Sequence, residues 1–86
     1  MNFEFDAAKS RANQAKHGID FEEARAIWKD DNRLELSAAG IDEPRFVVIG
    51  MIGEKHWAAV ITYRLDIVRI ISARRARDLE IECYEG

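Results

Sequence analysis

The chain has 86 residues, of which 48% are hydrophobic and 34% charged, and its formal net charge is −3. This length favours a single domain over residues 1–86, and the apolar fraction is too high for a disordered chain. One cysteine, Cys83, excludes an internal disulfide. His17 and His56 have no neighbouring ligands at a metal-binding spacing, so we expect no metal and no cofactor.

Three features predict a cytoplasmic protein without membrane contact. The longest apolar run, residues 57–63, is far shorter than the roughly 20 residues of a membrane-spanning helix. Residues 1–9 include Glu4 and Asp6 and lack the apolar centre of a secretion signal. The single cysteine also fits a reducing compartment.

Positive charge is concentrated in one short segment. Residues 64–77 carry five arginines and one aspartate, whereas residues 78–86 carry four acids and no base. Residues 1–44 hold ten acids and six bases. Because a phosphate senses the field within a Debye length of about 8–10 Å, this basic patch is compatible with a polyanion. The acidic remainder suits a basic or mixed protein partner.

The N-terminal part predicts a short strand and a first helix. Alternation at residues 3–5 indicates the strand. Asp6 is a suitable N-cap, residues 7–16 are rich in helix formers, and Gly18 is a standard terminator. Small side chains recur on one face of this helix and predict close packing on a sheet; they are Ala8, Ala12 and Ala15.

A second helix is predicted to begin after Asp20. Glu23 stands at the third helical position, where it forms a capping box with Asp20. Ala24, Ile27 and Trp28 then form a stripe that we expect to be buried.

The rest of the chain predicts four strands and a last helix. The strands cover residues 34–37, 45–51, 55–63 and 67–72, with a loop over residues 38–44. Short turns between them favour an antiparallel meander. The helix covers residues 76–84, with a packed face at Ala76, Leu79 and Cys83.

This element order predicts an α+β fold: a short N-terminal strand, two helices, an antiparallel four-strand meander and a C-terminal helix. The large apolar side chains expected in its core are Phe3, Phe5, Phe21, Ile27, Trp28, Phe46, Val48, Trp57, Val60 and Ile70.

The candidate chemistry lies around Arg74 and Arg75, where the last strand is expected to become helix. Guanidinium groups grip phosphate through paired hydrogen bonds, and a strand-to-helix junction can direct both at one anion. Glu80 and Tyr84 share a helix face beside them and are a candidate base and proton donor. The alternative is that the arginines pair with acids of the last helix and only solvate the surface.

Other candidates are weaker. His17 can act as an acid or base, although a histidine at a helix C-terminus more often caps or packs. Lys9 is ordinary for a surface helix. His56 beside Trp57 is compatible with base stacking, but an aromatic residue within a strand is usually core.

Three blocks of residues follow one another along the chain. The first comprises Phe3, Glu4, Phe5, Asp6, Lys9, Asn13 and residues 16–19 and 21–24; the second Arg45, Ile49 and Gly50; the third residues 69–76, Glu80 and Tyr84. In this order, over nearly the whole chain, they resemble the signatures of the BrnT family of toxins from bacterial type II toxin–antitoxin systems.

The resemblance implies a RelE-like fold and a ribonuclease that inhibits translation by cleaving RNA without a metal. It also implies a BrnA-like ribbon-helix-helix antitoxin, a hetero-oligomer with that antitoxin, and contact with operator DNA only through it.

For such a ribonuclease we expect the ribose 2′-hydroxyl to attack the phosphorus. Arg74 and Arg75 converge with Glu80 on one phosphodiester, and the base is Glu80 or, second, His17. Tyr84 or Lys9 protonates the leaving oxygen. RNA-binding side chains are expected at Arg45, Arg64, Arg69 and Arg77. Two other functions stay open: a non-catalytic nucleic-acid-binding regulator, and a degenerate toxin that acts only through antitoxin binding and operon control.

Overall fold

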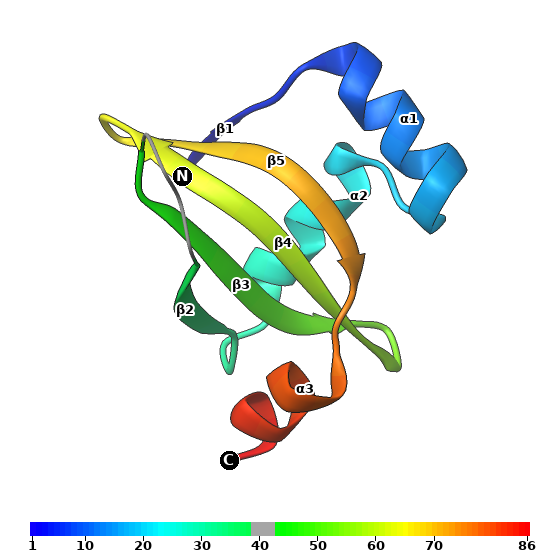
Figure 1. Cartoon of the computed structure of the whole chain (residues 1–86), viewed down its shortest axis with the longest axis vertical. Coiled ribbons are helices and arrows are strands. Elements are labelled where there is room, and N and C mark those ends of the chain that lie inside the picture. Colours follow the sequence, from blue (N-terminus) through cyan, green and yellow to red (C-terminus); the bar gives the residue numbers. More distant parts are fainter. Residues whose placement is uncertain (39–42) are drawn as a thin grey trace.

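The computed structural model describes residues 1–38 and 43–86 and shows a sheet flanked by helices (Figure 1). Its elements are β1 (Asn2–Glu4), α1 (Ala7–His17), α2 (Phe21–Ala24), the 3₁₀ helix η1 (Arg25–Lys29), β2 (Leu34–Ala38), β3 (Arg45–Ile52), β4 (Lys55–Arg64), β5 (Ile67–Arg75) and α3 (Asp78–Glu85). Most of the loop predicted over residues 38–44 lies outside the described residues. No helix in the described ranges is long and apolar enough to cross a membrane.

The sheet has five strands in the order β1-β5-β4-β3-β2. Strands β2 to β5 pair antiparallel with their neighbours, whereas β1 pairs with β5 in parallel. The predicted four-strand antiparallel meander is therefore replaced by a mixed five-stranded sheet. The N-terminal strand makes the difference, because it lies along the free edge of β5 and satisfies backbone groups there.

One irregularity in the sheet affects the direction of side chains. Between Val60 and Ile61 the register of β4 with β5 shifts: Val60 is opposite Ser72, but Ile61 is opposite Ile70. Such a bulge places an extra residue in β5, so the alternation of faces skips one position there. Arg69 and Ser72 therefore lie on the same face of the sheet, although a separation of three residues in a regular strand would place them on opposite faces.

One face of the sheet, here called the helical face, is covered by α2 and η1, while α1 lies beside β5 (Figure 1). Its core contains the buried side chains Ile19, Phe21, Ala24, Ile27, Val48, Ala59, Ile61, Val68, Ile70 and Ala73. Strand β3 approaches η1 closely at Gly50, where an added Cβ would lie 3.0 Å from Cγ2 of Ile27. The core thus lies between one sheet face and the segment that precedes β2.

Most of the predicted core residues lie in or against this core. Four are buried: Phe21, Ile27, Val48 and Ile70. Five more are partly buried and pack against them: Phe3, Phe5, Trp28, Phe46 and Trp57. Val60 is half-buried and belongs to the other face of the sheet, because it neighbours the core residues Ala59 and Ile61 in β4.

Helix α1 contacts the sheet through polar side chains. Ser10 and Asn13 are buried, while Ala8, Ala12 and Ala15 are exposed, so the predicted alanine face is wrong. The Asn13 amide donates to the carbonyls of Ile19 (2.7 Å) and Ala73 (2.8 Å) and accepts from the Ala73 N–H. These bonds connect α1 to β5 and fix the rotation of the helix.

The predicted helix boundaries are confirmed where capping signals are present. Asp6 accepts from the backbone N–H of Lys9, and Gly18 ends α1 with a φ of 80°. The capping box of α2 is complete, with Glu23 N–H to Asp20 at 2.7 Å and Asp20 N–H to Glu23 at 3.0 Å. These caps satisfy backbone donors that the first turn leaves free.

Helix α3 lies where β5 ends, away from α1 (Figure 1). It begins at Asp78 rather than residue 76 because β5 continues to Arg75 by pairing with β4. The predicted packed face of this helix is wrong, since Leu79 is 76% exposed and Cys83 is exposed. The more protected side chains of α3 are Glu80, Ile81 and Tyr84.

Candidate functional site

Four arginines lie on the sheet face opposite the helical face. In strands successive side chains point to opposite faces, and each of these arginines is next to a residue directed toward the core. Arg45 precedes the core-packed Phe46, Arg69 lies between Val68 and Ile70, and Arg74 follows Ala73. The fourth, Arg64, follows Tyr63, whose ring packs with that of Phe46. We call this surface, defined by Arg45, Arg64, Arg69 and Arg74, the arginine face.

The bulge in β5 is what brings Arg69 and Arg74 to the same face. They are five residues apart, a separation that puts two side chains on opposite faces of a regular strand. Because of the register shift, Arg69 is opposite Thr62 and Arg74 is opposite Ala58. Thr62 and Ala58 are four residues apart in β4 and therefore point the same way. Bulges are common beside functional sites for this reason.

Carboxylates accompany three of these arginines. Arg69 pairs with Glu4 of β1 at 2.5 Å, and Arg64 lies 3.9 Å from Glu43. Arg64 and Glu43 are both substantially exposed, so this ion pair is weak and an incoming anion can displace it. The arginine face thus carries local positive charge, and an incoming anion can replace the carboxylate of its exposed Arg64–Glu43 pair.

Arg74 has the most elaborate environment. Its two terminal nitrogens donate to both oxygens of Glu80, at 2.8 and 2.9 Å, and the two side chains are 17% and 15% exposed. The Glu80 carboxylate also accepts from the Arg77 backbone N–H. The hydrogen bonds from Arg74 hold the pKa of Glu80 below its usual range, and the same pairing raises the pKa of Arg74. Glu80 is therefore a carboxylate that already accepts three hydrogen bonds.

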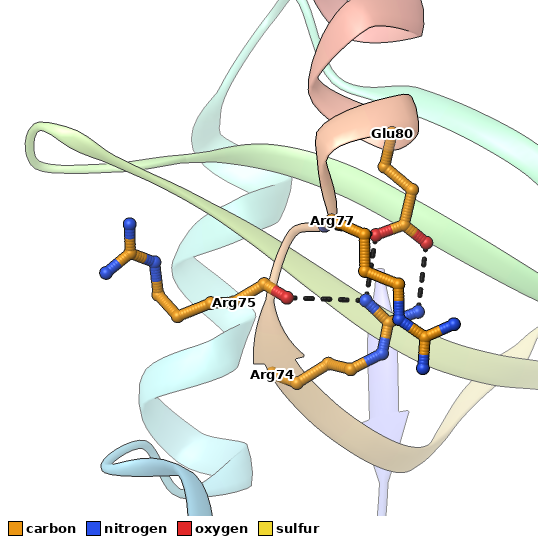
Figure 2. A network of polar contacts seen from close by, with 4 residues as sticks. All are labelled: Arg74, Arg75, Arg77 and Glu80. Atoms are coloured by element: carbon orange, nitrogen blue, oxygen red, sulfur yellow. Dashed lines mark hydrogen bonds and ion pairs between the residues drawn. The ribbon is translucent and has the colours of Figure 1, made fainter.

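Arg75 points away from this group, as Figure 2 shows, while Arg74, Arg77 and Glu80 gather on the other side. Its guanidinium lies 5.5 Å from the ring centroid of Trp57, its cross-strand partner, at the margin of the helical face. The predicted convergence of Arg74 and Arg75 on one phosphate is therefore wrong. Both residues belong to β5, and adjacent strand residues face opposite sides.

Tyr84 reaches from α3 to the end of η1. Its hydroxyl donates to Asp30 at 2.6 Å, and the same Asp30 oxygen accepts from the Met51 N–H at 2.8 Å. The hydrogen bond to Asp30 raises the pKa of Tyr84 to about 12, with burial and the charges of Asp30 and Glu85 contributing. The same bond lowers the pKa of Asp30. Tyr84 thus keeps its proton at neutral pH.

Lys9 and His17 do not join this site. Both belong to α1, which meets the edge of β5 through Asn13 and the backbone of Ala73. Helix α1 lies away from α3, which supplies Glu80 and Tyr84 (Figure 1). The structure brings together Arg74, Arg77, Glu80 and Tyr84, and leaves Arg75, Lys9 and His17 elsewhere.

Sequence reasoning missed three residues beside this group: Asp30, His56 and Glu85. His56 was interpreted mainly through its neighbour Trp57, but it is half-buried and its Nε2 lies 2.6 Å from a Glu85 oxygen. The alternation within β4 was a usable signal, because it separates His56 from the core-packed Trp57. No sequence signal connects Asp30 with Tyr84, 54 residues further along.

The arrangement can bind an extended polyanion and act on it at one point. Arg45, Arg64 and Arg69 present guanidinium groups along the sheet, and Arg74 lies with Glu80, Tyr84 and His56 under α3. Among residues 1–38 and 43–86, no group of three His, Cys, Asp or Glu side chains is arranged to hold a metal ion.

A comparison with protein families identifies a match over most of the chain. The model of the family described as "Ribonuclease toxin, BrnT, of type II toxin-antitoxin system" matches residues 5–80. That span includes every residue of the arginine face and Glu80, but ends before Tyr84. A comparison with curated proteins finds no match.

Proposed function

The chain belongs to the BrnT family of type II toxin–antitoxin ribonuclease toxins, and on that premise we propose that it cleaves RNA on its arginine face without a metal. The main observation behind this proposal is that four arginines from three strands lie on one face of the sheet, although the formal net charge of the chain is −3. These residues are Arg45, Arg64, Arg69 and Arg74. RNA phosphates respond to this local field, not to the total charge.

The proposed reaction uses the RNA's own nucleophile. The ribose 2′-oxygen attacks the adjacent phosphorus, its proton passes to a base, and the bond from phosphorus to the 5′-oxygen breaks. The leaving 5′-oxygen takes up a proton. The products are a 2′,3′-cyclic phosphate and a 5′-hydroxyl, and DNA is not cut because it lacks the 2′-hydroxyl.

Arg74 is the group that would stabilise the charged phosphoryl oxygens of the transition state. A well-placed donor of this kind contributes about 3–4 kcal/mol in other enzymes. To bind phosphate, Arg74 must exchange part of its contact with Glu80, whose carboxylate meets the guanidinium with the same two-pronged geometry. Glu80 thus holds Arg74 in place, and its lowered pKa makes it a poor base.

Tyr84 is a candidate donor to the leaving oxygen because its hydroxyl carries a proton and its ring packs against His56, although the raised pKa makes it a weaker acid than an ordinary tyrosine. That proton now points at Asp30, so a turn of the hydroxyl toward RNA is required. Arg77 and Arg64, both exposed, would contact flanking phosphates.

The biological part of the proposal follows from family membership. Cleavage of RNA inhibits translation in the cytoplasm, and a BrnA-like ribbon-helix-helix antitoxin neutralises the toxin by forming a hetero-oligomer. Operator DNA is contacted only through that antitoxin. The same proposal includes a fold that is similar to that of RelE.

The test is cleavage of a short RNA by the purified chain, with and without EDTA. We expect cleavage unaffected by EDTA, products that end in a cyclic phosphate, and no cleavage when the 2′-hydroxyl at the cut site is replaced by hydrogen. Cleavage abolished by EDTA overturns the metal-free mechanism.

The same assay separates the alternatives. A non-catalytic regulator binds the RNA without producing a cyclic phosphate. A degenerate toxin neither cleaves RNA nor arrests growth when expressed alone, yet still binds its antitoxin.

A further inference from the structure

His56 lies on the arginine face beside Arg74. Its side chain points the same way as that of Ala58, two residues further along β4, and Ala58 is the cross-strand partner of Arg74. Helix α3 contacts both positions, through Glu80 at Arg74 and through Tyr84 and Glu85 at His56. Diagonal neighbours of this kind in antiparallel strands are about 7–8 Å apart, within reach of one phosphodiester.

The hydrogen bond to Glu85 fixes the orientation of the His56 ring. The Nε2 atom lies 2.6 Å from the Glu85 carboxylate, which can only accept, so Nε2 is the donor. The lone pair is then on Nδ1. The contacts among the described residues include no hydrogen bond to Nδ1. The side chain is 20% exposed.

The other candidate bases are engaged or distant. Glu80 has its oxygens bound by Arg74 and Arg77, and Tyr84 carries a proton. Lys9 and His17 belong to α1, which lies away from α3 (Figure 1). Histidine is the side chain that changes charge near neutral pH, and pairing with a carboxylate is how enzymes orient it as a base.

The groups that surround His56 also favour its action as a base. From α3 it meets the Glu85 carboxylate and the edge of the Tyr84 ring, whose centroid is 5.3 Å away. From β3 its cross-strand partner is the uncharged Met51, and on β5 the charged side chain on the same face is that of Arg74. An imidazolium formed during the reaction is therefore stabilised by Glu85, while Arg74 is directed to Glu80.

We propose that His56 is the general base of RNA cleavage and that Glu85 is its positioning residue. Nδ1 takes the proton of the 2′-hydroxyl while the 2′-oxygen bonds to phosphorus. Arg74 holds the phosphoryl oxygens, and the 5′-oxygen leaves with a proton from Tyr84 or water. This inference rests on the proposed function, since it names the base for that reaction.

The experiment measures single-turnover cleavage of a short RNA between pH 5 and 9 for the unchanged chain, for His56→Gln and for Glu85→Gln. The matched control is Lys55→Gln, an exposed neighbour on the same strand. We expect the unchanged chain and the control to gain rate through a rising limb near neutral pH. His56→Gln lowers the rate about 10²–10⁴-fold and removes that limb. Glu85→Gln gives a smaller loss of rate, because glutamine can still accept from Nε2 but no longer offsets the charge of the imidazolium.

Glutamine can still donate to Glu85, which favours normal folding of the variant. Circular dichroism checks this, and His56→Ala with added imidazole gives a second readout. Recovery of rate with imidazole supports the base assignment. If His56→Gln retains the rate and the limb, or if imidazole fails to restore His56→Ala, the inference is overturned while metal-free cleavage stands. Absence of cyclic phosphate products from the unchanged chain overturns both.

Discussion

The two faces of the sheet differ in what touches them. The helical face is covered by α2 and η1 and buries aliphatic side chains such as Ile27 and Ile61 at 0% exposure. The arginine face presents arginines beside buried residues such as Ile49, and α3 lies at one end of it. Because strand side chains alternate, a single set of strands supplies the main core on one side and an arginine-bearing surface on the other. Most of the core and the candidate site thus lie on different faces.

Arg74 and Arg75 show this division most sharply. They are adjacent and identical in type, yet one pairs with Glu80 on the arginine face and the other lies over Trp57 at the margin of the helical face. Residue type alone therefore does not place a side chain in the site.

We expect the largest effect on RNA cleavage from a substitution of Arg74, measured against the same substitution of Arg75. Arg74→Lys keeps a positive charge near Glu80 but removes the two-pronged contact, so we expect RNA cleavage to fall about 10²–10³-fold. Arg75→Lys is the matched control and should leave the rate nearly unchanged. Single-turnover rates of RNA cleavage check this prediction. Equal losses of rate in the two variants would contradict the proposal that only Arg74 acts in the site.

The next comparison concerns stability. Ile27→Ala opens a cavity in the fully buried core, and we expect the free energy of unfolding to fall by about 2–5 kcal/mol. Val60 is half-buried and lies on the arginine face. Val60→Ala should lower the free energy of unfolding by about 1 kcal/mol, because neighbouring side chains and water can fill the space. Urea denaturation measures both. A larger loss for Val60→Ala would contradict the assignment of the core to the helical face.

A third prediction uses acid sensitivity around α3. The pKa values of Asp30 and Glu80 are lowered by folding from ordinary values of 3.8 and 4.5. Their contributions to stability are therefore complete above those values and are lost as pH falls through the folded pKa values. Unfolding free energies measured from pH 7 to pH 2 should decline at the acid end, with a shallower decline in Asp30→Asn and Glu80→Gln.

Tyr84 provides the alkaline counterpart. Its pKa is raised to about 12 by folding, so its contribution is complete below the ordinary value of 10.0 and is lost as pH rises toward 12. Tyr84→Phe should weaken the alkaline dependence of the unfolding free energy without removing it, because burial and the hydrogen bond to Glu35 also raise the pKa of Tyr63 to about 12.

The smallest effects are expected on the outer side of α3. Leu79→Ser and Cys83→Ser change exposed side chains, so the unfolding free energy should stay within about 0.5 kcal/mol. A loss of several times that amount would indicate that α3 packs through this side after all.

Much of the fold is determined locally and was predictable. The caps at Asp6 and Asp20 and the terminator Gly18 act within a few residues, so the sequence alone places those helix boundaries. Alternating and β-branched runs place the strands, since their period matches a half-buried sheet. The core stripe of Ala24 and Ile27 follows from helical spacing.

The site was less predictable because it depends on contacts far apart in the chain. Asn13, not the alanine face, fixes α1, because its amide meets the backbone of Ala73, 60 residues away. His56 and Glu85 are 29 residues apart and meet only once α3 packs against the sheet.

The sequence by itself determined the α+β class, the helix caps and the presence of a basic segment, since each depends on neighbouring residues or on composition. Only the tertiary structure decided which arginines share a face. Pairing with β4 extends β5 through Arg75 and separates it from Arg74, and the bulge beside Ser72 turns Arg69 to the side of Arg74. Register between strands sets both outcomes, and register is a property of the assembled sheet.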